Sequence, residues 1–213
     1  MIVSNKSLFE DEKNFIPDES FKKCIDKPKL LLHSCCGPCS TAVVERLTDE
    51  FDVTVFFYNP CITDEEEYRL RLKTQMDFIC RFNRENMGTI KVYFKEGSYR
   101  PTEYFDAVKG LEGEPEGGAR CSVCFKQRLE KTAETAGMSG YDYFGTTLTV
   151  SPHKNYKLIS EIGRELALRY GLTFVDRDFK KKDGFKRSIE LSKKYDLYRQ
   201  NYCGCEYSKI GRR

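Results

Sequence analysis

The sequence predicts an α/β protein with a doubly wound, mostly parallel five-stranded sheet, followed by an extra C-terminal helix and a cysteine-containing tail. Short apolar segments alternate along the chain with longer segments in which apolar residues recur at helical spacing. The first two apolar segments are continuous rather than alternating, which is typical of strands that are buried on both faces. Strands and helices that follow one another at this rhythm indicate a parallel sheet with helices packed against it.

The expected strands and helices follow from these patterns and from the residues that end them. Asn59 and Pro60 end the second strand, and Gly137 and Gly171 are expected to cap two of the helices. The expected strands cover residues 29–33, 52–58, 90–94, 143–150 and 172–175. The expected helices include residues 42–47, 68–79, 101–109, 124–136, 158–166 and 185–195.

Length and composition suit one catalytic domain over residues 29–213, preceded by a polar N-terminal arm over residues 1–28. The 36 Lys and Arg residues nearly balance 33 Asp and Glu residues, so the net charge of +3 does not by itself indicate a nucleic-acid partner. No apolar run approaches the ~20 residues of a membrane helix, and the N-terminus is too polar for a signal peptide. We therefore expect a cytoplasmic protein that does not act at a membrane.

Ten cysteines in such a chain favour metal ligation or redox catalysis over structural disulfides. Two of them, Cys24 and Cys80, are expected to be packing residues. Seven others form three groups: Cys35, Cys36 and Cys39; Cys121 and Cys124; and Cys203 and Cys205. The first group lies between a predicted strand and a predicted helix, where the helix N-terminus favours thiolate over thiol. We expect the fold to bring the three groups together as a redox-active metal site.

The spacing of the cysteines leaves several chemistries open. The segment from Cys36 to Cys39 has the CGPC sequence of the thioredoxin active site. Together with a second pair, Cys121 and Cys124, it also suits zinc or an iron–sulfur cluster about equally. The segment Cys203-Gly204-Cys205 favours redox chemistry, because a disulfide in so small a ring is strained and therefore labile and oxidising. The alternative is that this pair supplies two more ligands to the same metal.

Residues 110–118 contain four glycines and no periodic pattern, directly before Arg120 and Cys121. A segment in this place is expected to be a lid over the site rather than a simple linker.

The motifs taken together resemble the cobalamin-independent, cysteine-rich epoxyqueuosine reductases. The resemblance extends from about residue 29 to residue 208 and leaves the N-terminal arm outside. One departure is Cys61, where the family is expected to carry Asn, and residues 62–64 also differ from the expected pattern. The motifs that carry the resemblance are residues 33–39 (HSCCGPC), 58–60 (YNP), 120–125 (RCSVCF), 146–152 (TTLTVSP), 187–191 (RSIEL) and 198–205 (YRQNYCGC).

The resemblance implies the last step of queuosine synthesis, in which the epoxide of epoxyqueuosine at the wobble base of tRNA is reduced to an alkene with loss of water. It implies a 4Fe-4S cluster held by four cysteines and a redox-active dithiol, and it leaves Cys39 for a second, mononuclear metal ion such as iron. It also implies a sheet of the HUP or Rossmann-like type. Since the chain has no Walker P-loop, we expect no bound ATP. The implied cluster ligands are Cys35, Cys36, Cys121 and Cys124, and the implied dithiol is Cys203 and Cys205.

Other candidate site residues are expected from their chemistry. Asp178 is a candidate oxygen ligand or proton donor, although a solvated surface carboxylate is the equally ordinary alternative. Tyr202 is a second candidate proton donor, and His33 ranks low because a lone histidine at a strand end is usually a satisfied core residue. A local basic and aromatic cluster is expected to bind tRNA with a queuosine-type anticodon. Its members are Lys180, Lys181, Lys182, Lys186, Arg187, Lys193, Lys194, Tyr195, Tyr198 and Arg199, with Tyr202 beside them.

Two other functions stay open at this point. The first is a thioredoxin-like protein thiol–disulfide oxidoreductase that uses Cys36 and Cys39 without iron. The second is a non-catalytic, zinc-stabilised RNA-binding module. The reductase also requires an electron donor, which the sequence does not identify.

Overall fold

The computed structural model describes residues 27–210, and its centre is a five-stranded sheet in which every paired strand is parallel. The strand order is β3-β2-β1-β4-β5. The predicted fold class is therefore confirmed. The strands are β1 (Lys29–Ser34), β2 (Asp52–Phe57), β3 (Tyr93–Glu96), β4 (Tyr143–Thr146) and β5 (Thr173–Phe174).

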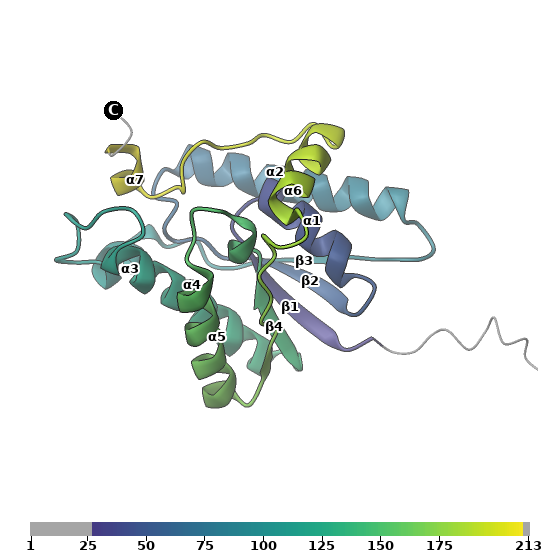
Figure 1. Cartoon of the computed structure of the whole chain (residues 1–213), viewed down its shortest axis with the longest axis horizontal. Helices are drawn as coiled ribbons and strands as arrows, with labels where there is room; N and C mark the ends of the chain where they lie inside the picture. The colour runs from purple at the N-terminus through teal and green to yellow at the C-terminus, as the bar shows by residue number, and fades with distance from the viewer. Residues whose placement is uncertain (1–26, 211–213) are drawn as a thin grey trace, which may run out of the picture.

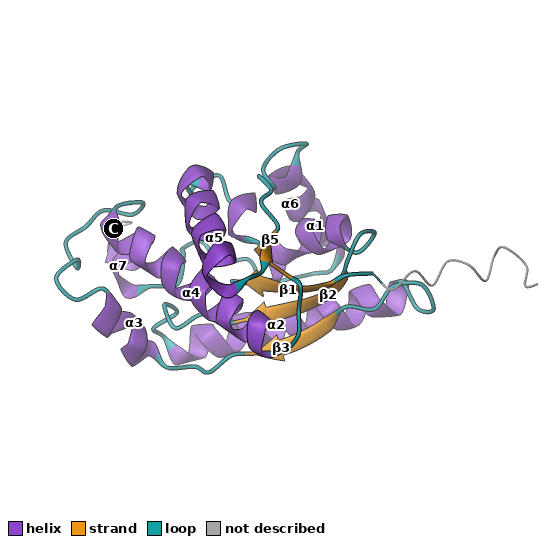
Figure 2. Ribbon diagram, turned by 90° about the horizontal axis from the view of Figure 1, so that it is seen from below, coloured by secondary structure: helices purple, strands orange, loops and turns teal. Residues whose placement is uncertain are grey.

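Helices cover both faces of this sheet, as Figure 2 shows. Leu30 and Leu32 on β1 pack into a core with residues of α1, α2 and α6, whereas Leu31 packs with residues of α4 and α5. This division follows from the strand geometry, because successive side chains of a strand point to opposite faces. The helices are α1 (Gly37–Leu47), α2 (Glu65–Glu85), α3 (Pro101–Ala107), α4 (Ala119–Met138), α5 (Tyr156–Tyr170), α6 (Gly184–Lys194) and α7 (Glu206–Ile210).

The strand order reverses between β1 and β4. The chain first adds β2 and β3 on one side of β1 and then places β4 and β5 on the other side. Ligands of open α/β sheets bind at such a switch point, outside the carboxyl ends of the strands. Cys35 directly follows β1 at this edge, and Cys61 lies in the turn after β2. The fold therefore places the first cysteine group at its customary ligand site.

Two strands, β3 and β4, differ from the predictions by more than one residue at an end. The third strand begins at Tyr93 rather than at residue 90. The fourth strand ends at Thr146, and a 3-10 helix over Leu148–Val150 replaces the second half of the predicted strand. The hydroxyl of Thr146 accepts the backbone N–H of Leu148, so a side chain satisfies a donor that the sheet would otherwise pair.

The end of one helix and the exposure of one cysteine also differ from the expectations. Gly171 caps α5 with a left-handed backbone as predicted, but α4 continues through Gly137, and Gly140 is the glycine with positive φ after its end. α4 begins at Ala119, so both of its cysteines lie near its N-terminus. Cys80 is exposed on α2 rather than packed, because the buried face of that helix holds Phe78, Ile79 and Phe82.

Most of the predicted N-terminal arm, including Cys24, lies outside the described residues. Within residues 27–210, none of the helices combines the length and the apolar character of a membrane span.

Candidate metal and redox centre

The first cysteine group lies where β1 turns into α1. Cys36 is the N-cap residue of α1, and the sulfur atoms of Cys35, Cys36 and Cys39 all lie within 4.8 Å of one another. Cys35 and Cys36 are buried. Gly37 permits this turn, because a Cβ there would lie 2.9 Å from the carbonyl oxygen of Thr74 on α2. The close approach of α1 to α2 thus places three thiols at one helix N-terminus.

The second group, Cys121 and Cys124, projects from the start of α4. Cys124 is buried and packs with Cys61 and Cys205, whereas Cys121 is half-buried. These four cysteines and Cys203 line a small cavity of about 30 Å³. The sequence marked Cys61 as a departure from the family pattern, and the structure places it among the predicted site cysteines.

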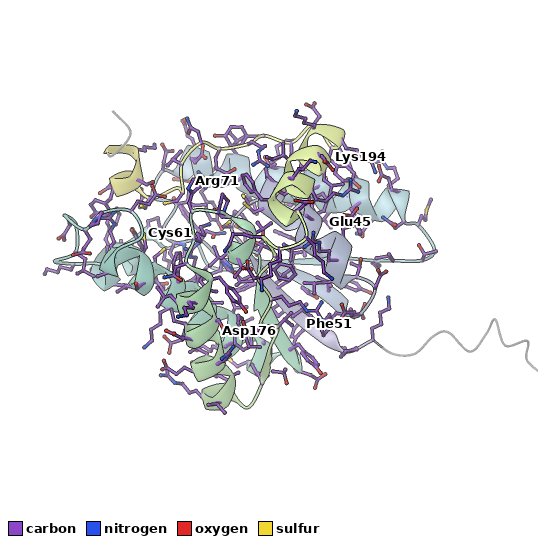
Figure 3. The ribbon with its side chains drawn as sticks, viewed as in Figure 1. Glu45, Phe51, Cys61, Arg71, Asp176 and Lys194 are labelled. Atoms are coloured by element: carbon purple, nitrogen blue, oxygen red, sulfur yellow. The ribbon has the colours of Figure 1, made fainter. Side chains whose placement is uncertain are left out.

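The third group lies on the segment that runs from α6 along α2 to α7 (Figure 1). The sulfur atoms of Cys203 and Cys205 are 3.5 Å apart, and Gly204 between them has a φ of 114°. Arg71 on α2 donates hydrogen bonds to the carbonyl oxygens of Tyr202 and Cys203, at 3.2 and 3.1 Å. Figure 3 labels Arg71 and Cys61, which come from α2 and from the turn after β2. The tail is therefore tied to the helix beside the first group.

A second cavity, of about 190 Å³, lies between the first and third groups and adjoins the small cavity. It is lined by Cys35, Cys39 and Cys203, and it shares Cys203, Lys154 and two further residues with the small cavity. Cys36 lies beside it and accepts a hydrogen bond of 2.9 Å from the side-chain amide of Gln200. The fold thus brings the three predicted cysteine groups together, as expected, and adds Cys61 to them.

A hydrogen bond between two neighbouring thiols lowers the pKa of one of them and raises the pKa of the other. The pKa of Cys35 is lowered by hydrogen bonds from Cys36 and Cys39 and further by the charge of Lys154, although burial opposes this shift. The corresponding bond to Cys35 raises the pKa of Cys36 to about 11. In the tail, the hydrogen bond from Cys203 lowers the pKa of Cys205 to about 6. The first and third groups therefore each contain one thiol that readily becomes a thiolate.

Buried and half-buried cations surround the thiols, and sequence reasoning did not place them at the thiol site. Arg71 is 1% exposed and pairs with Glu67 at 2.6 Å. Arg128 is 4% exposed, and Lys154 places its ammonium nitrogen 3.9 Å from the sulfur of Cys35. One signal was available for Arg128, because it follows Cys124 by four residues and therefore shares its helix face.

The acidic loop before α4 borders the site, as expected for a lid. Glu116 and Gly117 line the small cavity. The buried guanidinium of Arg120 donates hydrogen bonds to three carbonyl oxygens of this loop, those of Leu111, Glu112 and Glu114. The loop is therefore held against the N-terminus of α4 by a residue of the helix itself.

The candidate proton donors have different surroundings. His33 is fully buried, and its Nε2 donates to the carbonyl oxygen of Tyr58 while its Nδ1 accepts from the hydroxyl of Thr146. Burial lowers the pKa of His33 to about 3, so it is a neutral core residue, which agrees with its low rank. Tyr202 lines the larger cysteine cavity, and its ring lies 5.0 Å from the guanidinium carbon of Arg71.

The structure does not bring Asp178 to the cysteines. Its carboxylate pairs with the ammonium of Lys180 at 3.3 Å, and it lines a separate cavity with Arg46 and Phe179. Lys180 in turn donates to the carbonyl oxygen of Lys154. Asp178 therefore supports the segment beside the site from outside the cysteine cavities.

Some of the predicted RNA-binding side chains already pair with carboxylates of the protein, whereas others are free within the described part of the chain. The guanidinium of Arg187 pairs with Glu45 at 2.7 Å and with Glu190 at 3.3 Å, so its charge is largely compensated. The hydroxyl of Tyr198 donates to Glu67, and Tyr195 is buried and bonded to Glu85, so Tyr195 is not available to stack a base. Arg199 lines the larger cavity while it donates to the hydroxyl of Ser192.

Five lysines of the predicted cluster are exposed. Lys194 pairs with Glu85 at 2.6 Å, whereas Lys193 near the end of α6 forms no ion pair within residues 27–210. Lys181, Lys182 and Lys186 lie on the surface around the start of α6, and no carboxylate of the described chain forms an ion pair with any of them. The backbone of this segment is held by Arg46, which donates to the carbonyl oxygens of Lys181 and Lys182 at 3.0 and 2.6 Å.

Known proteins resemble this chain over almost the whole region described above. The sequence model of the family described as "Epoxyqueuosine reductase QueH" matches residues 30–210. The protein named epoxyqueuosine reductase QueH from Streptococcus pyogenes is 46% identical to this chain, over 85% of this chain and 71% of its own length. The protein of that name from Staphylococcus epidermidis is 44% identical to this chain, over 87% of this chain and 78% of its own length. The protein of that name from Thermotoga maritima is 36% identical, over 86% of this chain and 92% of its own. The chain therefore belongs to the epoxyqueuosine reductase QueH family.

Proposed function

We propose that this oxidoreductase of queuosine biosynthesis reduces the epoxide of epoxyqueuosine to the alkene of queuosine with a 4Fe-4S cluster and a cysteine pair. Its substrate would be the wobble base of a tRNA with a queuosine-type anticodon. The observation that carries the proposal is the meeting of eight cysteines from four separate segments around two adjoining cavities. A site built for structural zinc alone would need only four of them.

Four thiols would hold the cluster: Cys35, Cys36, Cys121 and Cys124. Their chemistry fits, because thiolates are the ligands of such clusters and buried cations near them favour the thiolate form. Cys39 would hold a second metal ion, iron, since its sulfur lies close to those of Cys35 and Cys36. When bound, the cluster supplies single electrons and the second ion supplies a Lewis acid.

The tail cysteines would supply the electron pair. Oxidation of Cys203 and Cys205 to a disulfide releases two electrons and two protons. Removal of the epoxide oxygen consumes the same number, because both C–O bonds break, a C=C bond forms and the oxygen leaves as water. Their sulfur atoms are already 3.5 Å apart, and Cys205 is the thiol that more readily becomes a thiolate. An external electron donor would then reduce the disulfide at Cys203, which lines the larger cavity, whereas Cys205 is buried.

Substrate binding would involve the larger cavity and the surface beside it. We propose Tyr202 as a proton donor in place of Asp178, because only Tyr202 lines a cavity that the cysteines also line. Arg199 at this cavity and the exposed Lys181, Lys182 and Lys186 would contact the phosphates of the tRNA. Arg187 would contribute little because two carboxylates already pair with it.

The test compares Cys203→Ser with Cys80→Ser, a change at an exposed cysteine outside the cysteine cavities. Iron, sulfide and absorption are measured on anaerobically prepared protein, and reductase activity is measured on tRNA that contains epoxyqueuosine. We expect about four irons and four sulfides in each protein, with further iron if the second site is filled, and loss of activity only in Cys203→Ser.

Other results would favour the other functions. Full activity in Cys203→Ser would refute the role of the dithiol. Bound zinc with no sulfide and no turnover after anaerobic reconstitution would indicate a zinc-stabilised RNA-binding module. Reduction of protein disulfides by an iron-free protein would indicate a thioredoxin-like enzyme.

A further inference from the structure

Two cations at the site have no carboxylate partner: Arg128, which is buried, and Lys154, which is half-buried. Arg128 is 4% exposed, and its Nε donates a hydrogen bond of 3.1 Å to the carbonyl oxygen of Cys124. The ammonium of Lys154 lies 3.9 Å from the sulfur of Cys35. Within residues 27–210, no Asp or Glu side chain forms an ion pair with either cation, whereas Arg71 nearby is paired with Glu67. A buried charge is unfavourable without a compensating charge, so these two cations require an anion at this place.

The groups that face both cations are thiols. Arg128 lines the small cavity together with its cysteines, and its ring neighbour is the apolar Phe125. Lys154 faces the first group, Cys35, Cys36 and Cys39, and it lines both cavities. Other charged or titratable residues also line these cavities. Glu116 and His153 are exposed, and Arg71 is paired with Glu67; the remaining ones are Arg199, Tyr104 and Tyr202. The positive charge of these two cations therefore lies beside both thiol groups that are proposed to hold the cluster.

We propose that Arg128 and Lys154 compensate the negative charge of the thiolate-held cluster and raise its reduction potential. This inference rests on the proposed function. A cluster with four thiolate ligands carries a net negative charge, and reduction adds one more negative charge. A fixed cation in surroundings of low dielectric constant stabilises the reduced state more than the oxidised state. A guanidinium retains its proton in proteins, so Arg128 supplies this charge throughout the reaction.

The burial of Arg128 favours the cluster over a substrate phosphate as its partner. Only 4% of the side chain is exposed, so an anion from solvent does not reach it, while the backbone of Cys124 holds it beside the thiols. Arg128 and Lys154 thus act on the cluster through their positive charge.

The experiment measures the reduction midpoint of the cluster in the full chain, by potentiometric titration followed by EPR and absorption. The variants Arg128→Gln and Lys154→Gln remove the charge, and Arg128→Lys and Lys154→Arg retain it. Lys126→Gln on α4 and Lys157→Gln on α5 remove charges that are exposed. We expect each neutral variant to lower the midpoint by about 59 mV or more, a tenfold change in the equilibrium constant for one electron. We expect the charge-retaining and exposed variants to stay near the wild type, and iron and sulfide to be unchanged in all of them.

Each alternative result has a distinct meaning. If the wild type holds the cluster and both neutral variants have its midpoint, the inference is wrong while the proposed function stands. If Arg128→Gln loses iron and Arg128→Lys retains it, the requirement for a positive charge is supported, and the midpoint of Lys154→Gln decides the effect on the potential. A wild type without iron and sulfide after anaerobic reconstitution overturns both the inference and the proposed cluster.

Discussion

Replacement of Arg71 by Met should detach the cysteine tail from the rest of the site. The guanidinium is 1% exposed, pairs with Glu67 at 2.6 Å and holds the carbonyl oxygens of Tyr202 and Cys203. Methionine fills similar space but leaves both carbonyl oxygens without this donor, and the largely buried carboxylate of Glu67 loses its charged partner and keeps only the hydroxyl of Tyr198. Loss of one member of a buried ion pair destabilises a protein by about 3–5 kcal/mol.

The same loss should be visible locally in the tail. About 3 kcal/mol corresponds to roughly a hundredfold change in an equilibrium constant. We therefore expect hydrogen exchange of the backbone amides around Cys203 and Cys205 to accelerate by about that factor, provided the tail opens without global unfolding. Reductase activity should fall as well, because Cys203 then no longer stays beside the first cysteine group.

Arg69→Met is the matched control for this prediction. Arg69 lies on the same helix and pairs with Glu65 at the same spacing, but its side chain is 73% exposed. Such an exposed pair contributes only about 0.3–0.5 kcal/mol. Urea denaturation measures the free energy of unfolding of both variants, and hydrogen exchange by mass spectrometry measures the tail. Equal destabilisation in the two variants, or normal exchange of the tail in Arg71→Met, would refute the anchoring role of Arg71.

Three further predictions concern the tail, Cys61 and the basic surface. Gly204→Ala should destabilise the protein by about 1–2 kcal/mol, because φ at this position is 114° and a Cβ would lie 2.8 Å from Cγ1 of Ile62. Urea denaturation measures this change, and an unchanged denaturation midpoint would contradict the prediction. Cys61→Asn should retain its iron and sulfide because the proposed ligands do not include Cys61, and loss of iron would make it a ligand. Lys186→Gln should reduce the salt dependence of tRNA binding by ~0.9 in slope, measured by fluorescence anisotropy, whereas Arg187→Gln should change it less because Glu45 and Glu190 pair with Arg187. Equal slopes in these two variants would contradict that assignment.

Element identity was predictable here because it depends on local patterns, whereas element ends depend on particular hydrogen bonds. The continuous apolar run after residue 52 is a strand, and the helical spacing after residue 68 is a helix. The fourth strand was predicted too long because its apolar run continues to Val150. The hydroxyl of Thr146 ends the strand by accepting the N–H of Leu148, a contact that hydrophobic periodicity does not contain.

The sequence by itself determined the fold class, the three cysteine groups and, through its motifs, the family. These are properties of composition, spacing and order along the chain. Only the tertiary structure decided which side chains meet: it added Cys61 and the buried Arg128 to the thiols, placed Asp178 in another cavity and paired Arg187 with carboxylates. The physical reason is that these neighbours come from different strands and helices, so their distances depend on the packing of the whole sheet and its helices.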